Sequence, residues 1–548
     1  MAKLVLGPLL RYVGETDATV WVETDEACEV SVLGSTDRTF CVYGHHYALV
    51  HVEGLERGTD HTYEVHLDAE RVWPEAGSRF PPSGFRTMPA ASPLRIAFGS
   101  CRVAAPHQPP FSLRKDEDDR GREIDALRLL ALRMRDLPRD EWPDLLLLLG
   151  DQVYADEISP GTRSFAESRR DTEEPPGERV LDYEEYSQLY GESWGEPVIR
   201  WLLSTVPSAM IFDDHDVHDD WNISAAWVEE MRATGWWEQH LVAAMMSYWV
   251  YQHIGNLTPA AHRDLELLER VKAGPDGTGP LREFAQQSAS GTDGDRWSYC
   301  RDLGSTRVVV IDSRAGRVLD EGSRSMVDDE EWEWIERHVS GDFDHLLIAT
   351  SLPFLLGEGM HHVEAWSEAV AGGAWGSLAA KLAERARRTV DLEHWAAFQK
   401  SFHALAGLQR SVGSGERGSA PASIVTLSGD VHHAYLFEVG FPRGSHVKSA
   451  VWQAVCSPYR NPLDSRERRV IRAGMSRPAA AVGRLLARAA GVQDPPIAWR
   501  QLDDGPWFDN QVATLDADGR RLVMRLEKAV PVDEDDGRLE CVLERRLA

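Results

Sequence analysis

The sequence predicts an α/β protein with an all-β sandwich domain at its N-terminus. Residues 1–88 contain short segments rich in β-branched and aromatic residues, separated at regular intervals by Gly and Asp turn signals. From Leu94 onward, short continuous apolar runs alternate with segments whose apolar residues recur at helical spacing. Strands that alternate with helices in this way are typical of an α/β core. We therefore divide the chain into two domains, 1–88 and 93–548, and expect helical inserts and a C-terminal extension in the second.

The strands of the N-terminal domain come first along the chain. After an initial strand within Met1–Leu10, the β-rich segments are Thr19–Thr24, Glu29–Leu33, Tyr47–Val52 and Thr62–Leu67. Their spacing is typical of a small β-sandwich. The segments Pro81–Gly84 and Pro89–Pro93 predict the linker to the second domain.

The first ten residues also bear on the location of the protein. They contain one Lys and a short apolar stretch, without a twin arginine or a small-residue cleavage site. We interpret them as a strand and not as a signal peptide, so we expect a cytoplasmic protein. The five leucines at Leu145–Leu149 are far too few to span a bilayer, and the sequence predicts no membrane span.

Six apolar runs in the second domain predict buried strands. They are Leu94–Phe98, Asp144–Leu149, Met210–Phe212, Val308–Ile311, His345–Ala349 and Ser423–Leu427. Helical spacing predicts helices at Ile124–Leu137, over much of 221–300 and near 476–490. The tail ends in two strand patterns, joined by a segment typical of a hairpin turn: Asn510–Leu515, Arg521–Leu526 and the turn Asp516–Gly519.

Between these elements lie charged inserts and an aromatic-rich segment. The inserts 114–123 and 166–180 predict surface loops. The aromatic residues at Trp236–Trp237 and Trp249–Tyr251 favour packing in a core, and a substrate-binding wall is the alternative.

The charge of the chain limits the classes of partner. With 59 basic and 88 acidic residues, the net charge of −29 argues against a broad nucleic-acid or anionic-membrane footprint. The same charge would repel an anionic substrate, and bound cations would solve that problem because they are often the largest local charges. Six scattered cysteines show no disulfide framework or zinc motif, and we expect Cys28 and Cys41 to be buried thiols although a hairpin disulfide is the alternative.

Four short segments that follow predicted strands concentrate metal-binding residue types. They are Phe98–Cys101, Gly150–Asp156, Phe212–Asp216 and Ser428–His433. Strand ends that face one edge of a sheet are where α/β enzymes place their chemistry. Carboxylates, imidazoles, a thiol and a phenol at that edge predict bound metal ions and the hydrolysis of a phosphate ester.

The second segment supplies a carboxylate and a phenol. Asp151, at the end of a buried strand, can bridge two cations, and Tyr154 three residues later can reach the same place. A phenolate is a hard anionic ligand that suits a strongly acidic ion such as ferric iron. The alternative for Asp151 is a helix N-cap, a common role for Asp after a strand.

The third segment places Asp213, Asp214 and Asp216 around His215. Three acids within four residues repel one another unless a cation or hydrogen bonds offset them. One aspartate could bind metal while His215 donates a proton to the leaving oxygen. A solvated acidic turn is the alternative, but the apolar residues before Asp213 argue against it.

The first and fourth segments contribute a thiol, a carboxylate and two imidazoles. Asp430 and His432, two residues apart, would lie on one side of an extended backbone and face the same ion, so His433 would point away and be structural. Cys101 alone would be a buried thiol, but next to the other three segments it becomes a candidate thiolate ligand.

Together, the four segments resemble the alkaline phosphatase D (PhoD-like) branch of the metallophosphoesterase superfamily. The family pattern is close to F-G-S-C, G-D-Q-x-Y-A-D, D-D-H-D/E and S-G-D-V-H, and all four parts occur here in the same order across roughly residues 94–460. Val310–Arg314 and Ala349–Pro353 also look like family segments, and the N-terminal β-domain resembles that of the family.

The resemblance implies a four-layer α/β/β/α core with a cluster of ferric iron and calcium, or other divalent ions, at its edge. Carried over by position, Cys101, Asp151, Tyr154 and His432 would hold the iron, and Asp151 would bridge to calcium. Asp214 and Asp430 would be further metal ligands, and His215 the acid or transition-state donor. Arg314 is a candidate phosphate clamp, with a structural ion pair as the alternative. The pattern also contains Asp156, Asp213 and Asp216, to which the resemblance assigns no definite role.

The resemblance also implies the reaction. A metal-bound hydroxide would attack phosphorus in line, in a small-molecule phosphate mono- or diester, while the cations offset the developing charge. The sequence leaves the oligomeric state and the ester open. Two other classes compete: a catalytically inactive surface- or carbohydrate-binding protein on the same fold, and a Ser-His-Asp hydrolase. Missing ligands would favour the first, but none of the expected ones is missing, and no G-x-S-x-G motif supports the second.

Overall fold

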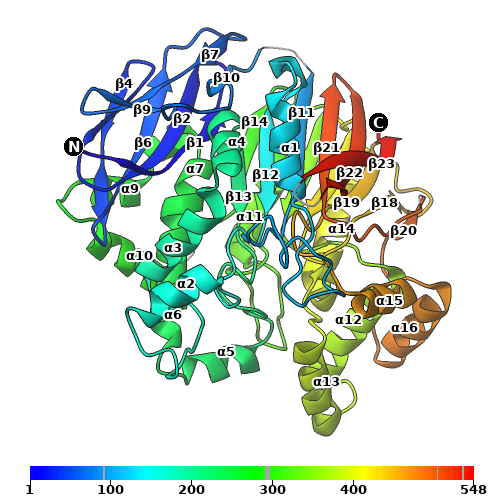
Figure 1. Ribbon diagram of the computed structural model, residues 1–548. Coiled ribbons are helices and arrows are strands. Elements are labelled where there is room, and N and C mark those ends of the chain that lie inside the picture. The colour runs from blue at the N-terminus through cyan, green and yellow to red at the C-terminus, as the bar shows by residue number, and fades with distance from the viewer. Residues whose placement is uncertain (90–92, 291–295, 503, 534–535) are drawn as a thin grey trace.

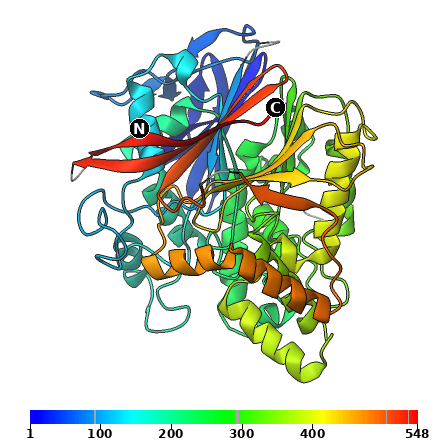
Figure 2. The same cartoon turned by 90° about the vertical axis from the view of Figure 1, so that its right-hand side faces the viewer.

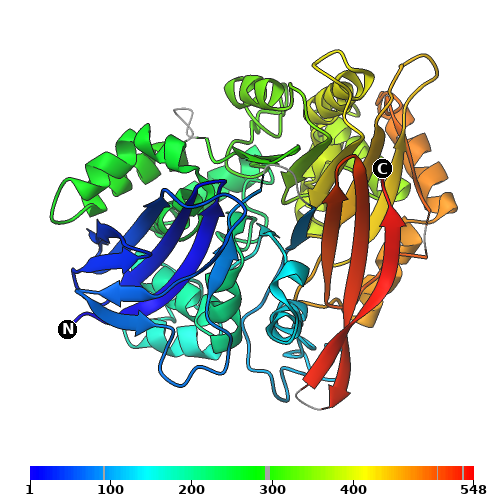
Figure 3. The same cartoon turned by 90° about the horizontal axis from the view of Figure 1, so that it is seen from above.

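The computed structural model describes residues 1–89, 93–290, 296–502, 504–533 and 536–548. In this part of the chain, two large sheets stack on each other and helices cover their outer faces (Figure 1). The N-terminal strands lie at one side of the molecule and the C-terminal strands at the other, as the view from above shows (Figure 3). Residues 90–92, in the predicted linker, lie outside the described residues.

Residues 4–86 form small antiparallel sheets. The first has the order β1-β2-β6-β5 and the second β4-β3-β8-β9, while β10 pairs only with β7. Between the two four-stranded sheets lies a core that includes Val20, Val50 and Tyr63. The strands are β1 (Leu4–Val13), β2 (Asp17–Thr24), β3 (Glu29–Val32), β4 (Ser35–Arg38), β5 (Phe40–Val42), β6 (His45–Glu53), β7 (Asp60–Thr62), β8 (Val65–Leu67), β9 (Glu70–Trp73) and β10 (Gly84–Arg86).

One predicted strand of this region is wrong. The segment Thr62–Leu67 is not continuous, because β7 ends at Thr62 and β8 begins at Val65. The two halves pair with different partners: β7 with β10, and β8 with β3 and β9. The chain therefore changes sheets at this point, which a run of β-forming residues does not reveal.

The first core sheet has the order β13-β12-β11-β21-β22-β23. Its three strands β11, β12 and β13 are parallel, and β21 pairs antiparallel with β11 from the far end of the sequence. The predicted C-terminal hairpin is confirmed, with the pair Asp518 and Arg521 closing a two-residue turn at Gly519–Arg520, and β23 is an additional strand. The strands are β11 (Leu94–Gly99), β12 (Leu145–Leu149), β13 (Ser208–Ile211), β21 (Gln511–Asp518), β22 (Arg521–Asp533) and β23 (Asp536–Arg546).

The second core sheet has the order β14-β15-β16-β17-β19-β18-β20, and β15, β16, β17 and β19 are parallel to one another. It contains the three predicted strands from the middle of the chain. The strands are β14 (Tyr299–Leu303), β15 (Thr306–Ile311), β16 (His345–Thr350), β17 (Ser423–Ser428), β18 (Tyr435–Gly440), β19 (Ala450–Val455) and β20 (Ala498–Gln501).

The side chains of β15 show that the core has four layers. Val308 and Val310 belong to the apolar cluster between the two sheets, whereas Val309 and Ile311 belong to a second cluster on the outer face. This alternation is the period of a strand that is buried on both faces. The cluster on the outer face includes residues of α11 (Asp329–His338) and α14 (Gln399–Ser414). The cluster that contains Val308 and Val310 also includes residues of α1 (Ala126–Arg135) and α4 (Pro197–Thr205), which lie beside the first sheet. The expected α/β/β/α order is confirmed.

Helical inserts surround these layers. Most of 221–300 is helical as predicted, and α6 continues through a π-helical segment at Tyr248–His253, where Trp249 and Tyr251 are buried in the core. The remaining helices are α2 (Pro160–Glu167), α3 (Tyr183–Trp194), α5 (Ala225–Arg232), α6 (Trp237–Ser247), α7 (Ile254–Asn256), α8 (Pro259–Arg263), α9 (Glu266–Lys272), α10 (Thr278–Ser290), α12 (Glu358–Ala371), α13 (Ser377–Thr389), α15 (Ser465–Gly474) and α16 (Arg477–Ala489), with 3₁₀ turns at Arg139–Glu141 and Trp395–Ala397.

A buried arginine of β1 ties the N-terminal strands to the helical insert. Arg11 has no exposed surface and donates hydrogen bonds to the carbonyls of Tyr251 (2.6 Å) and Gln252 (2.8 Å) in the π-helical segment. It also donates to Asn256 Oδ1 (3.2 Å), whose side chain bonds both backbone groups of Met210 in β13. A buried guanidinium is costly unless its donors are satisfied, so these bonds fix how the two parts pack.

Two remaining expectations concern cysteines and membranes. All six cysteines are free, so the hairpin disulfide between Cys28 and Cys41 is excluded; Cys28 is buried, as expected, and Cys41 is partly exposed. Among the described residues, no helix has the length and apolarity that a membrane crossing requires.

Glycines let the strand ends approach one another. A Cβ atom on Gly150 would lie 2.5 Å from Cβ of Asp213, and one on Gly429 would overlap the side chain of Ser100. Gly150 also has a φ of +107°, a conformation that other residues rarely adopt. The loops after β11, β12, β13 and β17 can therefore pack together only because these positions lack side chains.

The substitution Gly429→Ala tests this close packing. The added methyl group must push Ser100 away, so we expect a loss of about 1–3 kcal/mol in the free energy of unfolding, measured by chemical denaturation. The control is Gly407→Ala in α14, where a Cβ meets nothing within 4 Å and alanine is expected to stabilise the helix by roughly 0.5–1 kcal/mol. Equal effects of the two substitutions would contradict the packing described here.

Candidate metal centre

Four loops meet where β11, β12, β13 and β17 end. Backbone and side-chain hydrogen bonds join them: Cys101 N–H donates to the Gly150 carbonyl (3.2 Å), and Asp430 N–H donates to Ser100 Oγ (3.0 Å). The loops therefore form one unit, and it brings together the candidate ligands that the sequence places hundreds of residues apart.

The candidate ligands form overlapping groups, and two of these groups share Asp151. Ligand atoms of Cys101, Asp151 and His432 lie within 4.8 Å of one another, and so do those of Asp151, Asp213 and Asp214. Asp151 is common to both groups, which is the arrangement of a carboxylate that bridges two cations. Tyr154 lies beside the first group, with its hydroxyl 3.5 Å from Asp151 Oδ2.

Three buried oxygen atoms at this place have no hydrogen-bond partner among the described residues. They are Asp151 Oδ1, Asp213 Oδ2 and Asp214 Oδ1, and only the last has an ion-pair contact, with Arg314 Nη2 at 3.2 Å. A buried carboxylate oxygen without a donor is unfavourable, and a metal ion removes that cost. The residues present therefore fit a metal cluster.

The backbone at the candidate ligands supports the same conclusion. Cys101, Asp151, Asp430 and His432 all have φ between +51° and +63°, in the left-handed region. A left-handed backbone costs a non-glycine residue of order 1–3 kcal/mol in free energy. Residues with such strained backbones cluster at functional sites in proteins. In this site the left-handed conformation turns the side chains of successive loops toward one place.

Without cations, burial works against the charged forms of these ligands. Burial raises the pKa of the Cys101 thiol and the Tyr154 phenol well above their ordinary values, and the nearby Asp151 carboxylate raises both further. Burial likewise raises the pKa of Asp151. Burial lowers the pKa of His432 to about 3, which leaves its imidazole neutral and able to bind a metal. A bound cation would favour the deprotonated form of each acid.

The expected geometry of Asp430 and His432 is wrong. Both residues have left-handed backbones, so they do not project from one side of an extended strand. His432 joins the group of Cys101 and Asp151, whereas a carboxylate oxygen of Asp430 lies 3.1 Å from His394 Nε2. His433 is structural as expected, because its Nδ1 contacts the Val431 carbonyl at 2.6 Å and its ring stacks on Phe508.

Asp216 organises the backbone around the two ligand groups. Its carboxylate accepts hydrogen bonds from the backbone N–H groups of Asp151 (2.8 Å), Gln152 (3.2 Å) and Asp213 (2.9 Å). Gln252 Nε2 in the π-helical segment donates to the same carboxylate at 3.2 Å. Asp216 therefore connects the loop after β12 to the loop after β13, and both of them to the helical insert.

Arg314, the candidate phosphate clamp, is completely buried in an ion-pair network. Its guanidinium bonds Asp213 and Glu393, and Nη2 lies 3.2 Å from Asp214 and 3.8 Å from Asp430. Burial opposes its charge, yet these carboxylates keep its pKa well above the ordinary value. Arg314 offsets part of the negative charge around it and holds three site carboxylates in place.

His215 lies at the open side of the site, with its side chain 18% exposed. Its Nδ1 lies 2.9 Å from Asp156 Oδ1, and the backbone N–H of Asp219 donates to the other oxygen of Asp156 at 2.6 Å. Burial lowers the pKa of His215, but Asp156 and Asp214 outweigh burial and raise it well above the ordinary value. The Asp156 contact at Nδ1 thus favours the protonated imidazole of His215.

The sequence interpretation missed a second imidazole. Nδ1 of His394 lies 2.6 Å from Glu364 of α12, and its Nε2 lies 3.1 Å from Asp430. His394 and Glu364 do not follow a predicted strand, which was the criterion for candidate site residues. The one sequence signal for His394 is the group of ionisable residues at Asp391–His394. Asn461 was also missed: its Nδ2 donates to the Tyr154 hydroxyl at 3.1 Å.

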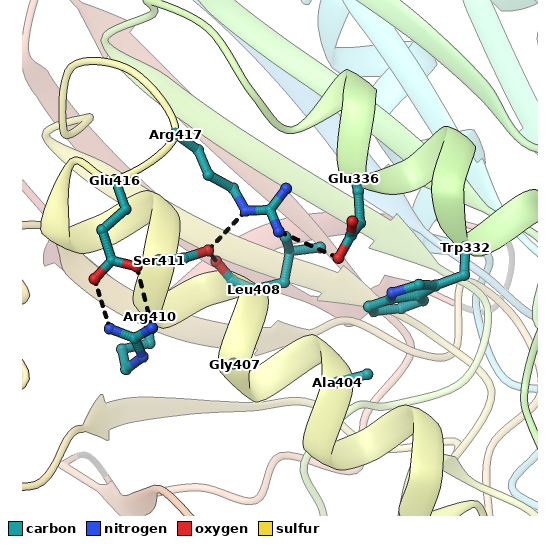
Figure 4. Close-up of a pocket in the computed structure, with 9 residues that line it drawn as sticks. All are labelled: Trp332, Glu336, Ala404, Gly407, Leu408, Arg410, Ser411, Glu416 and Arg417. Atoms are coloured by element: carbon teal, nitrogen blue, oxygen red, sulfur yellow. Dashed lines mark hydrogen bonds and ion pairs between the residues drawn. The ribbon is translucent and has the colours of Figure 1, made fainter. Parts of the chain in front are cut away.

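Two other features do not compete with this site. The cluster of His107, Asp125 and Glu196 is already bonded to Arg102 and Arg128. A cavity of about 560 Å³ lies between α11 and α14, and its charged side chains pair with one another (Figure 4). These pairs are Arg417 with Glu336 (3.2 Å) and Arg410 with Glu416 (2.7 Å).

Comparison with known proteins places the chain in a class and then in a family. Stacked sheets between helices, with clustered ligands at the strand ends, define an α/β metallophosphoesterase core. The chain belongs to the PhoD-like phosphatase family, whose model matches residues 133–484, and the resemblance inferred from the four motifs is thereby confirmed. Membership implies a phosphoesterase hydrolase. Residues 1–85 match a second model, described as a domain of unknown function, DUF7800.

Solved structures resemble this chain at low sequence identity. One described as "Structure of PhoD" shares 11% identity, with a TM-score of 0.58 over 99% of this chain and 92% of that one. The purple acid phosphatase PPD1 from yellow lupin (Lupinus luteus) seeds also shares 11% identity, with a TM-score of 0.46 over 97% of this chain and 73% of that one. No curated protein sequence matches significantly.

The substitution Asp216→Asn tests the organising role of this carboxylate. An amide nitrogen cannot accept, so at least one buried backbone donor loses its partner, and we expect a loss of about 2–4 kcal/mol in the free energy of unfolding. The matched control is Asp329→Asn, because that side chain is 92% exposed, and its effect should be within about 0.5 kcal/mol. Chemical denaturation of metal-free protein measures both, and equal stabilities would contradict the role given to Asp216.

Proposed function

We propose that this chain hydrolyses small-molecule phosphate esters at a centre of two or more cations that share Asp151. The observation that carries the proposal is the overlap of two buried ligand groups at Asp151, together with the oxygens Asp151 Oδ1 and Asp213 Oδ2, which lack hydrogen-bond donors. Membership of the PhoD-like phosphatase family supports the same reaction class.

The ligand types support ferric iron beside calcium. Cys101, Tyr154 and His432 surround one side of Asp151, and thiolate, phenolate and imidazole ligands suit a transition metal. The other side offers the carboxylates of Asp213 and Asp214, and Asp430 lies close to Arg314 beside them. Oxygen ligands alone suit a hard cation such as Ca²⁺. Analysis of the metal content of the purified protein would show whether other divalent ions occupy either position.

Each group of the chain has a definite task in this proposal. Bound cations would lower the pKa of a water molecule and neutralise the charge that develops on the phosphoryl oxygens. His215 donates the proton that the leaving oxygen requires, and Asp156 fixes the imidazole so that Nε2 faces the substrate. Arg314 has four carboxylates around it, so we assign it to positioning Asp213 and Asp214. Direct contact with phosphate, the other role considered for Arg314, would require it to leave these partners.

The alternative is a catalytically inactive binding protein on the same fold. It would be favoured if candidate ligands were absent or dispersed. In this structure Cys101, Asp151 and His432 lie together, and His215 keeps its carboxylate partner. Hydrolysis is therefore the function that the geometry supports best.

The substitution Asp151→Asn should abolish turnover while the protein stays folded, because the amide cannot bridge two cations. Turnover is measured as nitrophenol release from p-nitrophenyl phosphate and bis-p-nitrophenyl phosphate, with iron and calcium supplied. The faster substrate identifies the ester class. Wild-type activity should disappear on chelation and return when ions are added back, and activity that survives complete metal removal would contradict the proposal.

The substitution His215→Asn should reduce kcat more for a poor leaving group than for a good one. General acid catalysis contributes about 10²–10⁴-fold in rate, and p-nitrophenolate needs little of it because it leaves readily without a proton. We therefore compare p-nitrophenyl with alkyl phosphate esters. The control is His403→Asn, a partly exposed residue of α14. Equal losses for both leaving groups would exclude His215 as the proton donor.

A further inference from the structure

Three helices lie together at the end of the molecule opposite the N-terminal strands. In Figures 1 and 2, α13 and α16 project at the lower edge, with α15 leading into α16. Both α13 and α16 pack against α12. We call α13, α15, α16 and Trp375 the helical platform.

The helix α16 buries two small residues and exposes two large apolar ones, while Leu486 is partly buried. Gly483 and Ala487 are buried, and Gly483 packs so closely on α12 that a Cβ would lie 2.8 Å from the carbonyl oxygen of Gly359. Val482 and Leu485, on the opposite side, are 59% and 70% exposed. In a helix stabilised only by packing on the core, the larger apolar residues would face inward.

The helix α13 repeats this inversion. Ala383 and Arg387 are buried, four residues apart, and form the inner face. Leu378 and Leu382, also four residues apart, are 75% and 58% exposed. Residues at this spacing share one face of a helix. Each helix therefore carries an apolar stripe that no described part of the chain covers.

The exposed apolar residues are concentrated on this platform. Thirteen large apolar side chains are strongly exposed among the described residues, and six of them belong to the platform: Trp375, Leu378, Leu382, Val470, Val482 and Leu485. Trp375 also connects the two helices, because its indole N–H donates to the carbonyl of Ala489 at the end of α16 (3.2 Å). Exposed apolar residues gathered on neighbouring helices are typical of an interaction site.

The platform is basic although the chain as a whole is strongly acidic. Residues 465–490 contain seven arginines and one glutamate, whereas the whole chain has a net charge of −29. Arg477 of α16 and Lys381 and Arg385 of α13 are exposed close in sequence to the apolar residues. Arg484 and Arg488 pair with Glu358 and Asp494, and their charges are partly offset.

We propose that the helical platform docks on an anionic membrane surface. Amphipathic helices with exposed leucines and flanking arginines lie in the interface of anionic bilayers, which supply both an apolar layer and negative charge. A second copy of this chain, related by two-fold symmetry, would place the same arginines against one another. The average charge of the chain argued against an anionic-membrane footprint, but an average does not report one basic surface.

Binding to vesicles tests this proposal with the full-length protein. We expect co-sedimentation with vesicles of phosphatidylcholine mixed with phosphatidylglycerol, weaker binding at high salt, and little binding to phosphatidylcholine alone. The double variant Leu378→Glu, Leu485→Glu should weaken binding by about tenfold or more, because it removes apolar area and adds negative charge. Absence of binding by the wild type, or unchanged binding by the variant, would overturn the proposal.

A matched control separates the platform from exposed apolar residues in general. Val532 in β22 is 54% exposed and lies outside the platform, so Val532→Glu should leave vesicle binding unchanged. Circular dichroism and turnover of a soluble ester should be unchanged in all variants, which excludes unfolding. Light scattering measures the oligomeric state of the wild type and the double variant. A dimeric wild type that does not bind vesicles, together with a monomeric double variant, would overturn the proposal in favour of self-association.

Discussion

Several buried carboxylates lie together where four strands end, and the rest of the structure depends on how their negative charge is offset. Asp151, Asp213, Asp214 and Asp216 are almost completely inaccessible and lie close together. Like charges in a low-dielectric interior repel strongly, and burial adds the cost of desolvation. Arg314 offsets part of this charge through Asp213 and Asp214. Asp151 Oδ1 and Asp213 Oδ2 remain without a hydrogen-bond donor, and cations bound there would offset the cost of burying them. Metal binding would therefore also stabilise the site.

The same constraint explains features that lie away from the ligands. Asp216 collects backbone N–H groups from two loops, and Gln252 donates to it from the π-helical segment. Arg11 in β1 bonds two carbonyls of that segment. The N-terminal strands are thus connected to the site by three successive contacts between buried groups. This connection gives a physical reason for the N-terminal strands to pack on the α/β core, although the division of the chain at residues 88 and 93 stays a prediction.

Much of the core could be predicted from the sequence, because strands buried on both faces read as continuous apolar runs such as Leu145–Leu149. Edge strands lack that signal: β20 has four residues, and charged residues interrupt the apolar residues of β23. At the site, motifs after strands predicted candidate ligands that the fold brings together, but not the left-handed backbones of Asp430 and His432. The partner His394 could not be found, because only the folded chain brings it next to Asp430. The cytoplasmic location stays a prediction as well.

The central claim is that two cations share Asp151, and anomalous X-ray diffraction from crystals of the metal-loaded protein tests it most directly. The account predicts two peaks on opposite sides of the Asp151 carboxylate. One lies beside Cys101 and His432 and shows the absorption edge of a transition metal, and the other lies beside Asp213 and Asp214. A single peak, or peaks that do not contact Asp151, would contradict the account.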